Sequence, residues 1–302
     1  MQDLWIPVTI AAALFQTLRT AVQKYLAGRL STTASAFTRF AYGAPFALAY
    51  LAGLAAWQDA AVPAPDLAFV GWVLLGAVAQ IIATGLLIAA VTLRNFTVGV
   101  AWSKTEILQA ALVGIVLLGE PVGPVGTAGI MLATAGVMLM SLAKSGQGWR
   151  ALLAGLTERA ALVGIGAGAG FAISAVGFRG AALSLGLENP IFAASVTLAW
   201  ATTLQTLLLG AWLAWREPGQ LMLVLRSWRI SGLAGLASVL GSGCWFTAMT
   251  IQVVPYVRTL GLVELVFTYL LTVFWFRERP KLRELLGVLA MAGGIAMVLL
   301  AG

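Results

Sequence analysis

Two apolar stretches of the chain each carry a glutamate near their start. Glu106 lies in "SKTEILQAALVGIVLLGEP" (103–121), and Glu264 lies in "VELVFTYLLTVFWFRERP" (263–280). An ionised carboxylate among apolar residues is costly unless it pairs with a cation or faces water. Both glutamates are therefore candidates to bind a substrate or a coupling ion. A buried ion pair or a helix cap is the structural alternative.

The composition indicates the environment of these glutamates. Of the 302 residues, 61% are hydrophobic and 10% are charged, and the mean hydropathy is +0.96. A soluble domain needs a largely polar exterior, so this composition predicts a membrane protein. The net charge of +7 does not favour nucleic-acid binding, because the chain has no basic soluble domain to hold it. The single cysteine, Cys244, excludes an internal disulfide, and the lack of histidine excludes zinc ligation by that residue.

Ten hydrophobic segments follow one another, each close to the length of one bilayer crossing. They lie at about 5–27, 34–57, 67–92, 97–118, 124–143, 160–184, 190–215, 230–253, 256–276 and 284–301. Helices are expected for all ten, because a helix satisfies its own backbone polar groups in lipid. The sequence thus predicts an all-α polytopic membrane protein with ten transmembrane helices.

Cations also fall inside or at the edges of these segments. They are Arg19, Lys24, Arg39, Lys104, Arg179 and Arg258. A long cationic side chain near a helix end can reach the interface, and this is the alternative for Lys24, Arg39, Arg179 and Arg258. The predicted substrate-binding or coupling residues are Arg19, Arg39, Trp102, Lys104, Glu106, Arg258 and Glu264.

Two further features have structural interpretations. A second acid follows each glutamate after thirteen residues: Glu120 precedes Pro121, and Glu278 lies close to Pro280. These acids are predicted to be helix-end residues with a structural role. The run "GIGAGAG" (164–170) resembles a phosphate-binding loop only superficially, since it lacks the strand and the lysine that such a loop requires. It predicts close helix packing.

The longest polar linker, 144–159, divides the chain into an N-terminal five-helix repeat, 1–143, and a C-terminal one, 160–302. A shift of 158 residues superimposes the pattern E-x13-E-x8-G-x6-G of the two halves. It places Glu106 on Glu264, Glu120 on Glu278, Gly129 on Gly287 and Gly136 on Gly294. Because five is odd, the second half must enter the membrane from the opposite side. The repeats are therefore predicted to be inverted, a common plan among secondary transporters.

The windows "LLGEPVGPVGTAGIMLATAGVMLM" (117–140) and "VELVFTYLLTVFWFRERPKLRELLGVLAMAGGIAMVLL" (263–300) resemble the terminal helix pairs of the drug/metabolite transporter superfamily, in its EamA-type branch of ten-helix exporters. The resemblance implies inverted repeats around a central cavity and transport of small metabolites, usually outward. The chain departs from the family pattern at "WQDAAVPAPD" (57–66), which is acidic where many relatives are basic.

Loop charges predict the orientation. One alternating set of loops holds twelve Lys and Arg residues and the opposite set holds none. Since cationic loops stay cytoplasmic, both termini are expected to be periplasmic in a bacterial inner membrane. The family resemblance would instead imply cytoplasmic termini, and we follow the charges.

A secondary transporter that works by alternating access, in the direction of export, is the favoured function. The sequence offers no catalytic constellation, so no enzyme activity, cofactor or metal is expected. An ion channel is less favoured because the internal repeat supplies its own symmetry. A lipid-handling flippase or scramblase and a facilitative uniporter remain alternatives. The expected partners are the bilayer and a small-molecule substrate, with protons as a candidate coupling ion, and the chain is expected to be a monomer or homodimer.

The excess of intramembrane cations over acids predicts an anionic or zwitterionic substrate, such as an organic anion or an amino acid. Glu106 is the favoured coupling residue. It is expected to lie deep in one helix, with Lys104 on a different face and no partner within one turn. The competing hypothesis is that each glutamate permanently neutralises a cation, which leaves a uniporter.

Overall fold

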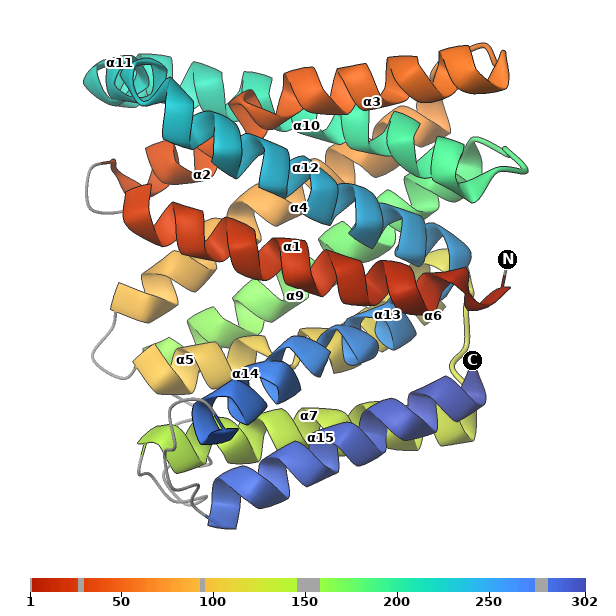
Figure 1. Ribbon diagram of the computed structural model, residues 1–302, viewed down its shortest axis with the longest axis vertical. Helices are drawn as coiled ribbons and strands as arrows, with labels where there is room; N and C mark the ends of the chain where they lie inside the picture. The colour runs from red at the N-terminus through yellow and green to blue at the C-terminus, as the bar shows by residue number, and fades with distance from the viewer. Residues whose placement is uncertain (1, 27–29, 93–95, 146–157, 275–281) are drawn as a thin grey trace. The chain divides into compact units, whose positions relative to one another are not determined.

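The computed structural model describes residues 2–26, 30–92, 96–145, 158–274 and 282–302, and all regular secondary structure in these ranges is helical (Figure 1). Seven of the predicted segments form single helices: α1 (Trp5–Leu26), α4 (Leu67–Thr92), α7 (Pro124–Ser145), α9 (Arg159–Ser184), α10 (Pro190–Arg216), α12 (Trp228–Ile251) and α15 (Leu282–Ala301). Within the described ranges, eight helices are long and apolar enough to cross a membrane. The all-α membrane fold is thereby confirmed.

Three predicted segments are each broken into two helices. The pairs are α2 (Thr32–Ala41) with α3 (Gly43–Gln58), α5 (Phe96–Ser103) with α6 (Glu106–Leu118), and α13 (Val254–Gly261) with α14 (Val263–Phe274). Two short elements were not expected from the sequence, the 3₁₀ turn η1 (Gln2–Leu4) and helix α11 (Pro218–Arg226). At each break a backbone N–H of the intervening turn still donates to a preceding carbonyl: Tyr42 to Thr38, Lys104 to Ala101 and Leu262 to Thr259.

Turn chemistry explains why helices begin and end where they do. The Asn189 side chain accepts from the backbone N–H groups of Ile191 and Phe192, and Pro190 occupies the first position of α10. Gly119 ends α6 with a φ of 66°, in the left-handed region that glycine adopts without strain. Local residue choices therefore fix these boundaries.

The chain divides into two compact units, and each contains segments from both halves. Unit 1 comprises Met1–Ile81 and Gly177–Ile251, and unit 2 comprises Ile82–Val176 and Gln252–Gly302. The division falls within α4 and α9, each of which contributes to both units. The sequence repeats are therefore not the compact bodies.

In unit 1, α1 packs along α12, and α10 contacts α2, α3 and α12. A buried cluster from α2, α10, α11, α12 and the segment before α2 includes Leu30, Phe37, Phe40, Leu209, Leu213 and Val224. Close approach of α12 to the break between α2 and α3 requires a glycine, since a Cβ on Gly235 would lie 2.5 Å from the carbonyl carbon of Tyr42.

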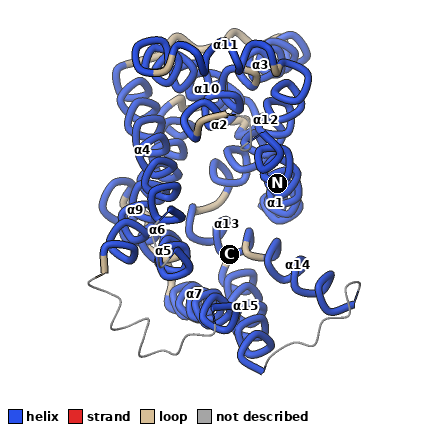
Figure 2. Tube along the Cα trace, turned by 90° about the vertical axis from the view of Figure 1, so that its left-hand side faces the viewer, coloured by secondary structure: helices blue, strands red, loops and turns tan. Residues whose placement is uncertain are grey.

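In unit 2, α7 and α15 lie side by side in both views (Figures 1 and 2). A Cβ on Gly294 would lie 2.5 Å from the carbonyl oxygen of Gly129, and one on Gly136 would lie 2.6 Å from that of Gly287. Gly129 meets Gly294, whereas Gly136, which comes later in α7, meets Gly287, which comes earlier in α15. The two helices are therefore antiparallel. The shift of 158 residues converts the contact between Gly129 and Gly294 into the contact between Gly287 and Gly136. The four repeated glycines therefore form one interface in which each helix contributes the same pair of positions.

The glycine run 164–170 also serves helix packing. It lies within α9, and a Cβ on Gly164 would meet the backbone of Gly99 in α5. A Cβ on Gly168 would lie 2.9 Å from the carbonyl oxygen of Ser103. The predicted packing role is confirmed, and it brings α9 against the break between α5 and α6.

Candidate functional site: charged residues at the helix breaks

In unit 2, Glu106 does not lie deep in a helix as expected. Helix α5 ends at Ser103, and Glu106 is the first residue of α6. The intervening turn is tightened by bonds from the N–H of Lys104 to the carbonyl of Ala101, at 3.1 Å, and from that of Thr105 to Trp102, at 3.2 Å. The carboxylate therefore lies at a helix N-terminus, where the peptide dipoles favour negative charge.

The second broken helix of unit 2 repeats this geometry. A shift of 158 residues places α5, Phe96–Ser103, on α13, Val254–Gly261. Glu264 lies in the first turn of α14 and is half-buried, as Glu106 is in α6. The repeat found in the sequence thus extends to the position of the helix break.

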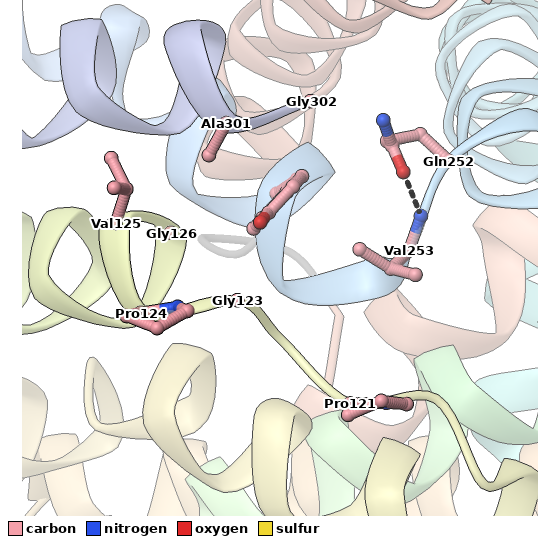
Figure 3. A pocket seen from close by; sticks show the side chains of 10 residues that line it. Pro121, Gly123, Pro124, Val125, Gly126, Gln252, Val253, Ala301 and Gly302 are labelled. Carbon is pink, nitrogen blue, oxygen red and sulfur yellow. Dashed lines mark hydrogen bonds between the residues drawn. The ribbon is translucent and has the colours of Figure 1, made fainter.

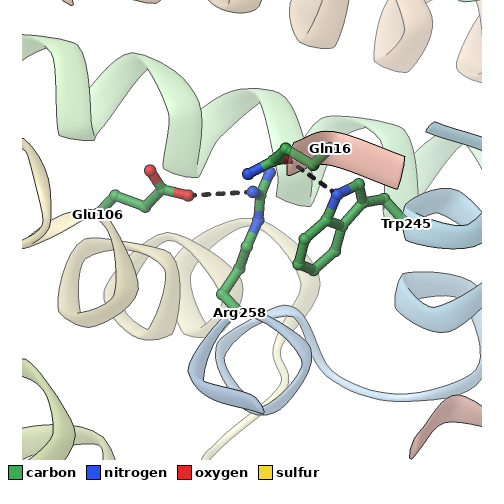
Figure 4. A network of polar contacts seen from close by, with 4 residues as sticks. All are labelled: Gln16, Glu106, Trp245 and Arg258. Carbon is green, nitrogen blue, oxygen red and sulfur yellow. Dashed lines mark hydrogen bonds and ion pairs between the residues drawn. The ribbon is translucent and has the colours of Figure 1, made fainter. Parts of the chain in front are cut away.

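Glu106 pairs with Arg258, a partner that lies far away in the sequence. Arg258 Nη1 lies 3.3 Å from Glu106 Oε1, and the two side chains are 19% and 17% exposed (Figure 4). Arg258 occupies the last turn of α13, so each charge also complements the dipole of its own helix. An ion pair is the structural alternative given above for Glu106, and the structure contains one. Its partner is Arg258 and not Lys104.

The surroundings of the pair in unit 2 are partly polar. Gln109 donates to Thr105 Oγ1 at 2.7 Å, and Thr105 Oγ1 donates to the Trp102 carbonyl at 2.6 Å. The indole N–H of Trp102 is buried and has no acceptor among the described residues. Lys104 is half-buried and makes no ion pair within the described part of the chain. Three of the predicted residues, Trp102, Lys104 and Glu106, thus cluster at one break.

In unit 1, the predicted residues Arg19 and Arg39 come together. Arg19 lies on α1 and Arg39 in the last turn of α2, and their charges interact electrostatically. The Arg39 guanidinium stacks 4.3 Å above the Phe40 ring, and its buried Nε has no acceptor among the described residues. Two cations near one another in a membrane-spanning region favour an anion between or beside them.

Unit 1 also holds polar pairs that the sequence reasoning missed. Trp245 Nε1 donates to Gln16 Oε1 at 3.1 Å (Figure 4), and the fully buried Gln205 donates to Gln80 Oε1 at 2.7 Å. A glutamine in an apolar helix was the only local signal. The partners lie 229 and 125 residues away, which no periodicity reveals.

Arg179 has a structural role. It is buried, and its guanidinium donates to the carbonyl oxygens of Met249 and Thr250 at the end of α12. A cation at that position satisfies carbonyls that lack helical partners and complements the dipole. Its side chain therefore does not snorkel to the interface, which was the alternative considered for it.

The helix-end acids are only partly described. Glu120 follows the last residue of the α6 cap and is half-buried, and its backbone N–H donates to the Gly114 carbonyl at 3.3 Å. This position at a helix end agrees with the prediction. Glu278 and the side chain of Lys24 lie outside the described residues.

Each unit has a pocket among its described residues. The one in unit 2 has a volume of about 450 Å³ and is lined by Pro121, Gly126, Val253, Tyr256 and Ala301, among others (Figure 3). The one in unit 1, of about 330 Å³, lies beside Glu188, Pro190 and Thr250. None of the predicted site residues lines either pocket, so the charged sites lie elsewhere in their units.

Comparison with protein families gives a match to the EamA-like transporter family at residues 3–142 and again at 159–300, which confirms the resemblance drawn from the terminal helix pairs. A solved crystal structure matches over 98% of this chain and 97% of its own, with a TM-score of 0.70 and 18% sequence identity. That likeness shows a shared fold. A comparison with curated proteins gave no match.

Proposed function

Because the chain belongs to the EamA-like transporter family, we propose that it is a secondary transporter that exports a small anionic or zwitterionic metabolite by alternating access. The family consists of membrane transporters of small solutes. The substrate charge, the direction and the mechanism are our proposals. The observation that carries the mechanism is the Glu106–Arg258 ion pair at a helix break within a membrane-spanning segment.

The substrate charge follows from the cations of the two units. Arg19 and Arg39 in unit 1 repel one another, and an anion bound by both would relieve that repulsion. A guanidinium binds a carboxylate or phosphate through two parallel N–H bonds, which gives orientation as well as affinity. In unit 2, considered by itself, Arg258 already binds a carboxylate, that of Glu106.

The ion pair suggests how transport could be gated. A substrate carboxylate can replace that of Glu106 on Arg258, because the two groups have the same charge and geometry. A carboxylate that loses its cation in a low-dielectric site favours its protonated form. Proton uptake would then accompany anion binding, so the anion and the proton would move in the same direction. In the direction of export, the outward gradient of the anion would have to drive both. If the pair stays closed, the protein is a facilitative uniporter driven by the substrate gradient alone.

The orientation proposed from loop charges places both termini in the periplasm of a bacterial inner membrane. Hydrogen bonds in unit 1 support the grouping of its loops. Ser31 donates to Glu217 and Gln220, which joins two connections of the cationic set. Asn189 donates to Gln58 at 3.2 Å, which joins two connections of the other set. Labelling of cysteines placed in the two sets in a Cys244→Ser background would test the orientation.

Reconstitution into liposomes tests the proposal directly. Uptake of an organic anion, a zwitterionic amino acid and an organic cation should rank the first two above the third. A clear preference for the cation contradicts the charge argument. Transfer of a labelled phospholipid between leaflets without metabolite flux would instead identify a lipid-handling member.

Glu106→Gln and Glu264→Gln, with and without an imposed pH gradient, test the coupling. Proton coupling predicts that the gradient drives wild-type flux and that one of the two variants loses this drive but keeps substrate exchange. Wild-type flux that ignores the pH gradient identifies a uniporter.

A further inference from the structure

The connection between α10 and α12 in unit 1 concentrates arginine and tryptophan. We call these residues the Arg–Trp cluster: Trp212, Trp215, Arg216, Arg226, Trp228 and Arg229. They lie at the end of α10, at the end of α11 and at the start of α12, and all six are exposed. None of them takes part in the proposed transport mechanism.

Helix α11 is fixed to unit 1 through its inner face. Val224 is fully buried in the cluster formed by α2 and α10, and Tyr42 Oη donates to the Val224 carbonyl at 3.0 Å. Ser227 Oγ donates to the same carbonyl at 2.9 Å. Helix α11, which ends in Arg226, is therefore packed against α2 and α10.

The outer face of α11 is apolar. Met222, Leu223 and Leu225 are 52%, 42% and 57% exposed. A short helix with buried residues on one face and exposed apolar residues on another, ending in arginine, has the character of an interfacial helix that contacts the acyl region below the headgroups. The exposed tryptophans on both sides are typical of the same depth.

The indole rings hold two of the guanidinium groups. Arg216 lies 4.1 Å above the Trp215 ring and 5.5 Å from that of Trp212, and Arg229 lies 5.4 Å from the Trp228 ring. Stacking occupies the planar face of a guanidinium and leaves its N–H edge free to donate to an anion.

No carboxylate neutralises these arginines within the described ranges. The one acid in the segment from 212 to 229, Glu217, accepts a bond from Ser31 Oγ at 2.6 Å, at the start of α2. The segment from 212 to 229 thus carries three arginines and one glutamate, a net charge of +2. The three arginines are exposed, as are the apolar side chains of α11.

We propose that the Arg–Trp cluster binds the headgroup of an anionic phospholipid. The headgroup phosphate would accept from guanidinium groups of the cluster, and the acyl chains would lie along the exposed leucine and methionine side chains of α11. The exposed arginines together with the apolar face of α11 favour a lipid over a free phosphate. A soluble anion would contact the arginines alone, whereas a phospholipid would also cover the apolar face.

The test compares binding of phosphatidylglycerol and phosphatidylcholine to the purified full chain by native mass spectrometry. The wild type should bind phosphatidylglycerol more tightly. R216Q/R229Q should weaken that binding by roughly fivefold per arginine, and should leave phosphatidylcholine binding unchanged. R159Q/R283Q removes the same charge from two exposed arginines outside the cluster and should keep most of the preference.

Equal losses in the two double variants, or no loss in either, would overturn the proposal, since net charge alone would then explain the binding. Displacement of the lipid by inorganic phosphate would also overturn it, because the site would then accept a free anion. If R216Q/R229Q cannot be purified, R216Q against R159Q makes the same comparison.

Discussion

The two broken helices of unit 2 share their backbone and differ in their charges. Both break at positions related by the shift of 158 residues, and both resume with a glutamate in the first turn. Lys104 in the first break corresponds to Leu262 in the second, and Arg258 corresponds to Val100. The repeat thus preserves the geometry and the acids, while the cations are specific to each half.

This difference shows which features of the site are determined by the internal symmetry of the chain. A repeat-related partner for Glu264 would have to stand at position 100, where valine carries no charge. The Glu106–Arg258 pair therefore has no symmetric copy, and the two glutamates cannot be interchangeable. For the proposed alternating-access mechanism, this means that the two repeats would contribute similar backbone geometry and different binding chemistry.

The largest predicted effect comes from breaking the asymmetric pair. Arg258→Met should destabilise the protein by about 3–5 kcal/mol, because it leaves the Glu106 carboxylate without its cation in a site that is mostly closed to water. Thermal and denaturant unfolding in detergent would measure this loss.

The double variant Arg258→Met with Glu106→Gln sharpens the result. It should recover much of the stability, because both charges are gone. In contrast, Glu264→Gln combined with Arg258→Met should recover none. Equal recovery with either glutamine would mean that the two acids are equivalent, against the asymmetry described above.

A second comparison separates structural from functional arginines. Arg179→Gln should cost about 1.5–3 kcal/mol of stability, because a charged donor to two carbonyls at the end of α12 is lost. It should leave the order of preferred substrates unchanged. Arg39→Gln should change stability less and should lower uptake of anions relative to zwitterions. Flux and unfolding measured on both variants decide between the roles, and a reversed pattern contradicts them.

Sequence reasoning predicted the spans well because their ends are set locally. Pro190 after Asn189, Gly119 and the Pro-rich turns define boundaries by backbone preference, which is readable from neighbouring residues. The break after Lys104 has no such signal, since neither glycine nor proline occurs in "WSKTE" (102–106) and the stretch stays apolar on both sides. The sequence therefore predicted one continuous helix there.

The ion pair could not be predicted for a different reason. Arg258 and Glu106 come from different halves. Each is an unusual charge in an apolar segment, but nothing in the sequence shows that the two side chains meet. The same holds for Arg179, whose carbonyl partners lie 70 and 71 residues away. Residue type marks a buried charge as special, whereas only the packing of helices decides between a cap, a pair and a binding site.

The glycine interface offers a test of the symmetric part of the molecule. Gly294→Ala should destabilise the protein by about 1–3 kcal/mol, because the added methyl would meet backbone atoms of α7 that cannot yield without moving the helix. Gly136→Ala, its repeat equivalent, should cost a similar amount. Gly293→Ala is the matched control, since its Cβ would meet only a side-chain atom of Leu132 at 3.5 Å. Unfolding that is equally affected at 293 and 294 would contradict this interface.

The smallest predicted effect concerns the helix caps of unit 1, where a similar local motif occurs in two settings. Asn189→Ala removes an acceptor for two N–H groups at the start of α10 and should cost about 1 kcal/mol. Ser31→Ala removes the cap of α2, and with it the hydroxyl that donates to Glu217. It should cost more than the cap alone, because the Glu217 carboxylate loses a donor while Gln220 still holds the Ser31 backbone. Glu217→Gln combined with Ser31→Ala separates the two contributions: the difference between the caps should shrink in the double variant. Equal losses from Asn189→Ala and Ser31→Ala would mean that the bond to Glu217 adds nothing to the stability of this connection.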